Sequence, residues 1–224
     1  MTEHPRGLGP VRAEGGRFVV LEGGEASGKS TQAARLAERL DAVITREPGG
    51  TAIGAGLRDL LLDARTTGLA DRAEALLMAA DRAQHVAEVI RPALAAGRHV
   101  VSDRYVGSTL AYQGFGRGLP VDELRRLSAW AAHGLEPDVI VLLDMPPALT
   151  ADRVAGRPDP ALDRLEAAGD GFHDRVTDGY RRLAAADPAR WVVVDGTAET
   201  HDVETAVWKA VVSRCPELAA HERR

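Results

Sequence analysis

Short apolar segments alternate with amphipathic segments along most of the chain. The apolar segments are rich in β-branched residues, as strands buried on both faces of a parallel sheet are, and they lie at residues 18–22, 42–46, 99–103, 139–144 and 191–195. Between them, apolar side chains recur at helical spacing and predict helices at residues 30–41, 51–63, 71–96, 120–133, 146–155, 162–186 and 201–213. This alternation predicts an α/β fold, with a five-stranded parallel sheet and helices on both of its faces.

The first predicted strand leads into a glycine-rich segment, residues 23–30, which reads Gly-Gly-Glu-Ala-Ser-Gly-Lys-Ser. The pattern G-x-x-x-x-G-K-[ST] between a strand and a helix is that of a phosphate-binding loop. Its glycines allow successive backbone N–H groups to face phosphate oxygens, and the following helix adds its positive end. We therefore expect ATP to be bound by Gly23, Gly24, Glu25, Ala26, Ser27, Gly28, Lys29, Ser30 and Thr31.

Two residues of this loop carry chemistry. Lys29 can reach the β- and γ-phosphates, and the hydroxyl of Ser30 can ligate Mg²⁺. The 224-residue chain has 28 basic residues, of which only Lys29 and Lys209 are lysine. A chain with so little lysine nevertheless has one at the loop position that needs a compact ammonium, which supports the assignment.

The overall composition narrows the classes of protein that fit. A net charge of −5 argues against general nucleic-acid binding, and the single cysteine, Cys215, excludes an internal disulfide and fits a reducing compartment. The longest aliphatic run, residues 139–143, is too short to span a membrane, and no apolar leader is visible. We expect a cytoplasmic protein without a membrane or nucleic-acid partner. Residues 1–16, rich in Gly, Pro and charge, predict a flexible N-terminal tail before one domain at residues 17–224.

The ends of the predicted strands carry a candidate metal ligand. Ligands of parallel sheets bind beyond the carboxyl ends of the strands, where a carboxylate can hold Mg²⁺. Asp103 and Asp144 both follow apolar runs and both fit this pattern. We assign the metal to Asp103, because Arg104 follows it directly and would bring an anionic acceptor beside the metal.

Arginines are frequent at strand ends and in loops, and five are candidates: Arg46, Arg82, Arg104, Arg153 and Arg157. A permanently charged, bidentate guanidinium suits an enzyme that transfers a phosphoryl group between two anionic nucleotides. The chain has no Asn-Lys-x-Asp sequence, which weakens an assignment as a GTPase.

Four segments carry a resemblance to a known family. Residues 45–51 (TREPGGT), 103–105 (DRY) and 111–114 (AYQG) resemble the signature segments of thymidylate kinases, and residues 162–166 (LDRLE) resemble the segment after the lid of that family. The resemblance extends over about residues 18–197. It implies a P-loop nucleoside monophosphate kinase fold with a short lid segment. It also implies transfer of the γ-phosphate of ATP to dTMP with Mg²⁺, giving dTDP, and a homodimer.

The resemblance also implies roles for single residues. Arg46 and Arg104 would bind the acceptor phosphate, and Arg82 would hydrogen-bond the thymine edge. Tyr112 would lie against the deoxyribose and help to exclude a 2′-hydroxyl. Glu25 would lie near the sugar and the metal. Three further residues would complete the acceptor site, namely Ser108, Gln113 and Met78, the last at a position where the family often has a stacking phenylalanine.

On the donor side, Arg153 would lie against the adenine of ATP. The family takes a catalytic basic residue either from the phosphate loop or from the lid. Residues 24–27 of this loop include no basic residue, whereas the lid has Arg157. The catalytic residues implied are therefore Lys29, Asp103, Arg104 and Arg157, with Ser30 and Asp103 at the metal.

Other interpretations of the same residues remain open at this stage. Arg82 could be a solvated helix arginine, Tyr112 could be ordinary core packing, and Arg153 could pair with Asp152 or Glu166. The chain could also be a kinase of another nucleoside monophosphate or of a deoxynucleoside. A nucleotide-dependent switch or binding module that transfers no phosphate is the alternative from a different class.

Overall fold

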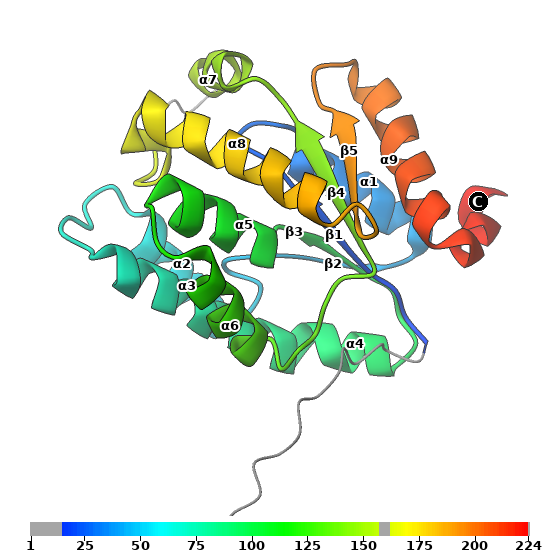
Figure 1. Cartoon of the computed structure of the whole chain (residues 1–224). Coiled ribbons are helices and arrows are strands. Elements are labelled where there is room, and N and C mark those ends of the chain that lie inside the picture. The colour runs from blue at the N-terminus through cyan, green and yellow to red at the C-terminus, as the bar shows by residue number, and fades with distance from the viewer. Residues whose placement is uncertain (1–14, 157–161, 224) are drawn as a thin grey trace, which may run out of the picture.

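The computed structural model describes residues 15–156 and 162–223, and its centre is one parallel sheet with the strand order β2-β3-β1-β4-β5 (Figure 1). The predicted tail lies outside the described residues except for Gly15 and Gly16. The five-stranded parallel sheet predicted from the sequence is confirmed. Its strands are β1 (Phe18–Glu22), β2 (Val43–Arg46), β3 (Val100–Asp103), β4 (Val139–Asp144) and β5 (Trp191–Asp195).

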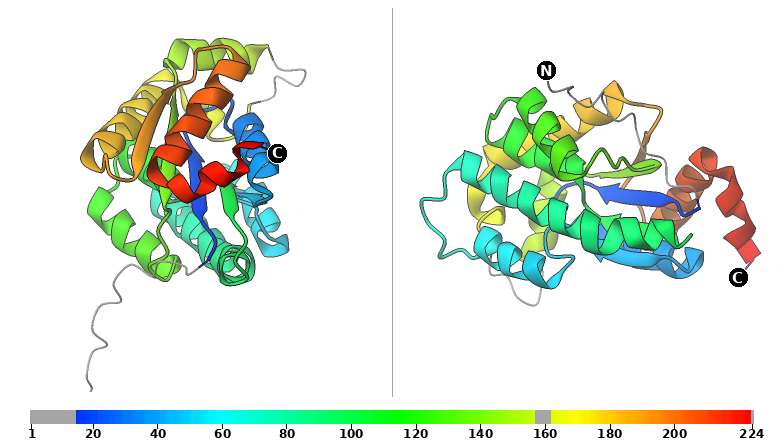
Figure 2. Two further views of the ribbon diagram at one scale, coloured as in Figure 1. Left: turned by 90° about the vertical axis from the view of Figure 1, so that its right-hand side faces the viewer. Right: turned by 90° about the horizontal axis from the view of Figure 1, so that it is seen from below.

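Helices cover both faces of this sheet (Figures 1 and 2). The longer helices are α1 (Lys29–Leu40), α2 (Ala52–Leu62), α3 (Asp71–His85), α6 (Val121–Ala131), α7 (Pro147–Ala155), α8 (Asp170–Ala186) and α9 (Thr200–Arg214). Shorter helical segments are η1 (Val86–Ile90), α4 (Arg91–Ala95), α5 (Val106–Thr109), η2 (Leu110–Gly116), η3 (Glu166–Ala168) and η4 (Pro216–Arg223).

Alternate residues of β1 divide the apolar interior into two cores. Phe18 and Val20 belong to the core under α3, α6 and α8, whereas Val19 and Leu21 belong to the core under α1 and α9. All four are at most 1% exposed. The central strand is therefore buried on both faces, which explains why its sequence is an apolar run without alternation.

The strand register brings the chemical residues to one edge of the sheet. Leu21 of β1 and Arg46 of β2 both pair with Asp103 of β3. Because all strands are parallel, the segments that leave their carboxyl ends start side by side. The loop that follows Glu22 therefore lies next to Arg46 and Asp103.

The helical segments at residues 106–116 and 216–223 were not predicted from the sequence. Residues 106–116 form α5 and the π-helical η2, and α8 lies along them (Figure 1). Glycines lower the helix propensity of this segment, but they are needed for close packing. A Cβ at Gly107 would lie 2.7 Å from Glu22 Oε1, and one at Gly116 would lie 2.5 Å from a ring carbon of Phe172.

The predicted helix at residues 162–186 was wrong at its beginning, since α8 starts only at residue 170. Asp163 begins a separate turn before η3, because its Oδ1 accepts hydrogen bonds from the backbone N–H groups of Leu165 and Glu166, both at 2.8 Å. Gly169, with φ of 86°, separates η3 from α8. The helix predicted at residues 71–96 is observed as the consecutive segments α3, η1 and α4, of which η1 is a π-helical turn. In the described part of the chain, no helix is long and apolar enough to cross a membrane.

Candidate active site

The phosphate loop lies between β1 and α1 and is closed by two glycines with positive φ. Gly23 has φ of 147°, and a Cβ there would lie 2.7 Å from the carbonyl oxygen of Leu143. Gly28 has φ of 89° and is the N-cap of α1, without a side-chain capping hydrogen bond. The first N–H groups of α1 are therefore free of a side-chain acceptor and available for an anion.

Lys29 is buried within this loop. Its ammonium donates to the carbonyl oxygen of Gly24 and, at 3.2 Å, to Ser27 Oγ, and the residue is 6% exposed. Burial, followed by repulsion from Arg104, lowers the pKa of Lys29 to about 8. An anion beside Lys29 would restore its charge, so the loop is prepared for phosphate.

The two predicted metal ligands lie together. Ser30 Oγ donates to Asp103 Oδ2 at 2.5 Å. The other carboxylate oxygen, Asp103 Oδ1, is buried and has no hydrogen-bond partner among the described residues. A hydroxyl beside a carboxylate with an unused oxygen is a donor set that suits Mg²⁺.

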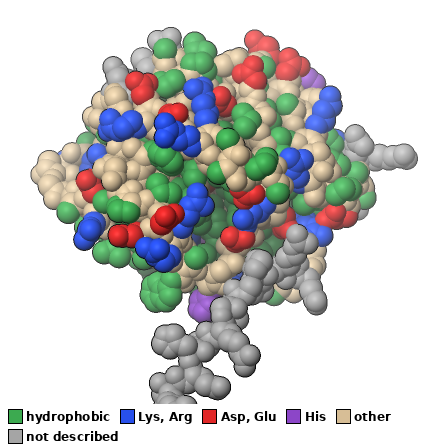
Figure 3. Space-filling model, viewed as in Figure 1, with side chains coloured by type: hydrophobic (Ala, Val, Ile, Leu, Met, Phe, Trp, Pro, Cys, Tyr) green, Lys and Arg blue, Asp and Glu red, His purple; other side chains and the backbone are tan. Residues whose placement is uncertain are grey.

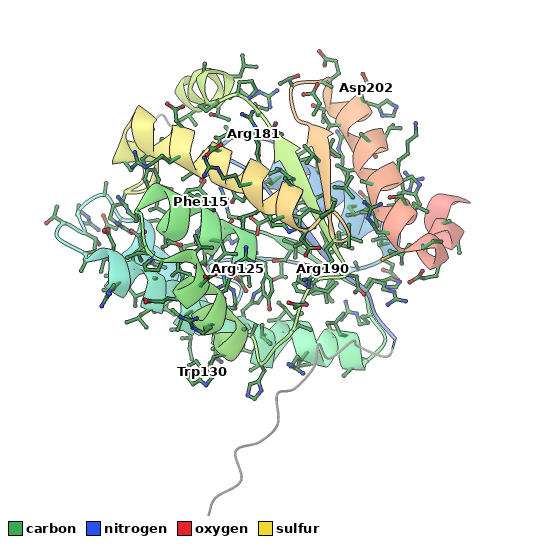
Figure 4. The ribbon with its side chains drawn as sticks, viewed as in Figure 1. Phe115, Arg125, Trp130, Arg181, Arg190 and Asp202 are labelled. Atoms are coloured by element: carbon green, nitrogen blue, oxygen red, sulfur yellow. The ribbon has the colours of Figure 1, made fainter. Side chains whose placement is uncertain are left out.

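Asp144, the alternative metal ligand, is occupied differently. Both of its carboxylate oxygens accept from Arg181 Nε of α8, each at 3.0 Å, and Figure 4 shows Arg181 on the outward side of that helix. Oppositely charged side chains are interspersed over this face of the molecule (Figure 3). Asp144 therefore takes part in a surface ion pair, which makes it a weaker candidate than Asp103 for the metal ligand.

Arg104 occupies the centre of the site. Its φ of 74° is unusual for a residue with a side chain and turns the chain at the end of β3. One terminal nitrogen donates to the carbonyl oxygen of Gly23 at 2.9 Å and the other to Glu25 Oε1 at 2.5 Å. The hydroxyl of Tyr112 donates to the same Glu25 oxygen at 2.6 Å. Phosphate loop, β3 and η2 are thereby joined at one guanidinium.

Three arginines surround the space in front of the loop. Arg46 and Arg104 line a cavity of about 300 Å³ together with the phosphate loop and Asp103, and so does Arg58 of α2. Burial, followed by repulsion from Arg46 and Arg104, lowers the pKa of Arg58. Cations that repel each other around a cavity form an anion-binding site.

A second cavity adjoins the first and is lined by less polar residues. Met78, Tyr112 and Gln113 line it, as do Arg82 and Ser108. Gln113 is fully buried: its Nε2 donates to Glu74 Oε1 at 2.8 Å, while its Oε1 has no partner within the described part of the chain. One residue of this cavity wall therefore carries a buried acceptor without a partner among the described residues.

Arg82 is 2% exposed, so its interpretation as a solvated helix arginine was wrong. Its Nε donates to Glu47 Oε2 at 2.9 Å, and one terminal nitrogen donates to Thr109 Oγ1 at 3.0 Å. Glu47 Oε1 also lies 2.9 Å from His85 Nδ1, and the other ring nitrogen lies 2.6 Å from Thr45 Oγ1. These contacts fix the guanidinium at the edge of the second cavity.

The structure brings most of the predicted residues together but leaves Arg153 apart. Arg153 lies on the opposite side of the phosphate loop, where its terminal nitrogens are 3.4 Å from the carbonyl oxygen of Ala26 and 3.5 Å from that of Gly196. Arg157 lies outside the described residues, and its role stays a prediction.

Three residues of the site were missed from the sequence. Arg58 is one helix arginine among many, and Tyr180 lies far along the chain, so neither gave a signal. Glu22 did give one, because it is a charged residue at the end of an apolar strand. It is fully buried, and its Oε2 accepts from Ser108 Oγ at 2.6 Å and from the hydroxyl of Tyr180 at 3.1 Å.

Comparisons with known proteins agree with this geometry. A family model described as thymidylate kinase matches residues 21–207. The chain is 52% identical over 204 residues to the thymidylate kinase of Solidesulfovibrio magneticus, covering 87% of this chain and 98% of the relative. It is 50% identical over 212 residues to that of Bifidobacterium longum, covering 91% and 99%. Among solved structures, thymidylate kinase from Ehrlichia chaffeensis is similar with a TM-score of 0.72 at 30% identity, covering 88% of this chain and 99% of that one.

Proposed function

The chain belongs to the thymidylate kinase family, whose members are ATP-using dTMP kinases that form dTDP, and on this premise we propose which residues carry out the phosphoryl transfer. The observation that supports the proposal is the shared wall of the two cavities. Glu25, Glu47, Arg58 and Arg104 line both of them. ATP in the first cavity and dTMP in the second would therefore meet at Arg104, as transfer between two phosphates requires.

On the donor side, the phosphate loop would bind the β- and γ-phosphates of ATP, and Lys29 would neutralise charge on the transferred group. Arg153, beyond the loop, would lie against the adenine. Ser30 and Asp103 would hold Mg²⁺, and the unused Asp103 Oδ1 fits that role. When bound, Mg²⁺ supplies positive charge to the phosphate oxygens.

On the acceptor side, three arginines would bind the 5′-phosphate of dTMP. Arg58 and Arg104 line both cavities, and Arg46 lines the first. Arg104 is held in place by Gly23 and Glu25 before any substrate arrives. Such preorganisation lowers the cost of orienting the phosphate for attack.

The thymidine part of dTMP would occupy the second cavity. Arg82 would donate to a carbonyl oxygen of thymine, and Gln113 Oε1 would accept from the imide N3–H. Met78 would cover the face of the ring. The buried Tyr112 would pack against the deoxyribose and leave little room for a 2′-hydroxyl, with Ser108 and Glu25 beside it.

A coupled assay of nucleoside diphosphate formation from ATP tests the function. The acceptors are dTMP, dUMP, dCMP and dGMP, each as the only acceptor. We expect dTMP to have the highest kcat/KM. Preference for another monophosphate or for a deoxynucleoside would reassign the substrate, and ATP binding without transfer to any acceptor would point to a switch.

We also propose that the protein is a homodimer that uses the exposed face of α3 and α6. Trp130 is 79% exposed and Leu76 is 57% exposed, and Figure 4 shows Trp130 pointing outward from α6. Large apolar side chains on one face are typical of association surfaces. Light scattering after gel filtration should give twice the mass of 23.8 kDa for the chain. Trp130→Glu should give the monomer mass.

A further inference from the structure

The side chain of Glu74 lies behind the second cavity and is linked to its wall by a hydrogen bond with Gln113. It belongs to the first turn of α3, is fully buried, and does not line the second cavity. Gln113 Nε2 donates to Glu74 Oε1 at 2.8 Å across 39 positions of sequence. The pair connects α3 to η2.

Two arginines hold the same carboxylate. Arg117 donates to both oxygens of Glu74, at 3.3 and 3.2 Å, and Arg164 Nη1 lies 2.7 Å from Oε2. Although burial opposes ionisation, hydrogen bonds from Gln113 and from these arginines lower the pKa of Glu74. The carboxylate is therefore ionised at neutral pH and can only accept hydrogen bonds.

An acceptor-only neighbour decides which way the Gln113 amide faces. The NH₂ group must point to Glu74, because the reversed amide would place two oxygens against each other and lose a charge-assisted hydrogen bond. Oε1 is then left on the other side of the amide, buried and without a partner among the described residues. A ligand that fills the pocket must donate a hydrogen to it, or the acceptor stays unpaired.

We propose that Glu74 is a positioning residue that sets base specificity by fixing the orientation of the Gln113 amide, so that the pocket accepts a pyrimidine with an N3–H donor and rejects cytosine, whose N3 is an acceptor. This inference rests on the proposed function, in which the base lies against Gln113. It does not depend on a contact between Glu74 and substrate. Glu74 acts through one hydrogen bond, and thymine and uracil are equivalent to it.

The test compares dTMP with dCMP in the full chain carrying Glu74→Gln. Glutamine has the same shape but offers either a donor or an acceptor, so Gln113 can face both ways. We expect the ratio of kcat/KM for dTMP over dCMP to fall by about tenfold or more, which corresponds to about 1.4 kcal/mol. The change should come mainly from a lower KM for dCMP.

Arg117→Ala is the matched control. It removes a cation from Glu74 and lowers the melting temperature, but Arg164 keeps the carboxylate in place and the Gln113 hydrogen bond stays. The ratio of kcat/KM for dTMP over dCMP should not change in Arg117→Ala. If Arg117→Ala lowers the ratio as much as Glu74→Gln does, Glu74 has only a structural role.

A double-mutant cycle separates action through Gln113 from any other route. In a Gln113→Leu background, Glu74→Gln should leave the ratio unchanged, because no amide remains to be oriented. A further fall there would overturn the inference. Should Glu74→Gln not fold, Glu74→Asp replaces it: Asp also only accepts, so the preference for dTMP must survive, and its loss contradicts the proposal. If the unchanged protein does not phosphorylate dTMP, the proposed function fails instead.

Discussion

The hydroxyl of Ser30 and the carboxylate of Asp103 lie 2.5 Å apart, although 73 positions separate them in the chain. The contact exists because β1 and β3 are neighbours in the sheet and end at the same level. Ser30 lies in the first turn of the helix after one strand, and Asp103 ends the other. The sheet register thus places both at one edge of the phosphate-loop cavity, where they would hold a divalent cation.

Replacement of Asp103 by Asn should raise the Mg²⁺ concentration needed for activity, and it should weaken nucleotide binding less. Loss of an outer-shell partner of a metal site typically lowers metal affinity or activity by about 10- to 100-fold, and loss of a carboxylate that holds the metal should cost at least as much. Titration of activity with Mg²⁺ at saturating ATP and dTMP measures this. Asp144→Asn is the control, because Asp144 ends the neighbouring strand but pairs with Arg181. A shift of the Mg²⁺ requirement in Asp144→Asn alone would move the metal to that residue.

Lys29→Ala should nearly abolish turnover in a protein that remains folded. The ammonium would stabilise charge on the transferred phosphoryl group, and removal of such a donor typically lowers kcat by about 10²–10³-fold. Steady-state kinetics and circular dichroism check both statements. Lys209→Ala, which changes the exposed lysine of α9, should retain full activity. Near-normal turnover of folded Lys29→Ala would remove the phosphate loop from the mechanism.

ATP binding should take up a proton at alkaline pH. Free Lys29 has a pKa of about 8, lowered first by burial, and bound phosphates raise it again. Through this lysine, the affinity for ATP should not vary with pH well below pH 8 and should fall as the pH rises above that value. Calorimetry in two buffers of different ionisation enthalpy, at about pH 7 and about pH 9, reports the proton.

The same shift has the opposite sign for folding. Between pH 8 and the ordinary lysine pKa of 10.5, the unfolded chain binds this proton more strongly, so the contribution of Lys29 to stability increases with pH.

In Lys29→Met, the proton uptake on ATP binding should disappear. If it persists unchanged, another group titrates.

Met78 should make the second cavity, where the base would bind, less selective between thymine and uracil. A methionine gives apolar contact with less rigid stacking than an aromatic ring. Discrimination of thymine from uracil would then depend on one methyl group, worth about 1–3 kcal/mol or about 10- to 200-fold in kcat/KM. We expect dUMP to be used measurably and Met78→Phe to bind dTMP equally well or more tightly. Equal dTMP affinity in the Phe and Ala variants would show that Met78 is core packing.

Glu47→Ala should destabilise the fold strongly. It leaves Arg82, which is 2% exposed, without its carboxylate, and such a loss typically costs about 3–5 kcal/mol. Urea unfolding measures the free energy. Asp178→Ala, which breaks the exposed pair with Arg182 on α8, should cost only about 0.3–0.5 kcal/mol. A similarly small loss of unfolding free energy in both variants would contradict the stabilising role assigned to Glu47.

The parts that were predictable from sequence are those where the local pattern has one physical meaning. The apolar run before Gly23 and the helical spacing after Lys29 place the loop and hence the sheet edge. Gln113 shows the limit, because only the fold brings Glu74 beside it and leaves its Oε1 unpaired. Residues 106–116 were not predicted as helical, since glycines that serve tertiary packing resemble those of a loop.

The scarcity of lysine has a practical consequence for chemical labelling. Apart from its α-amino group, the protein offers an acylating reagent only two amines, the exposed Lys209 and the buried Lys29. Bound ATP would shield the second. A fluorophore or an immobilisation linker would therefore attach to the unaltered chain at the α-amino group or at α9, and loss of activity on labelling without nucleotide would report modification inside the loop.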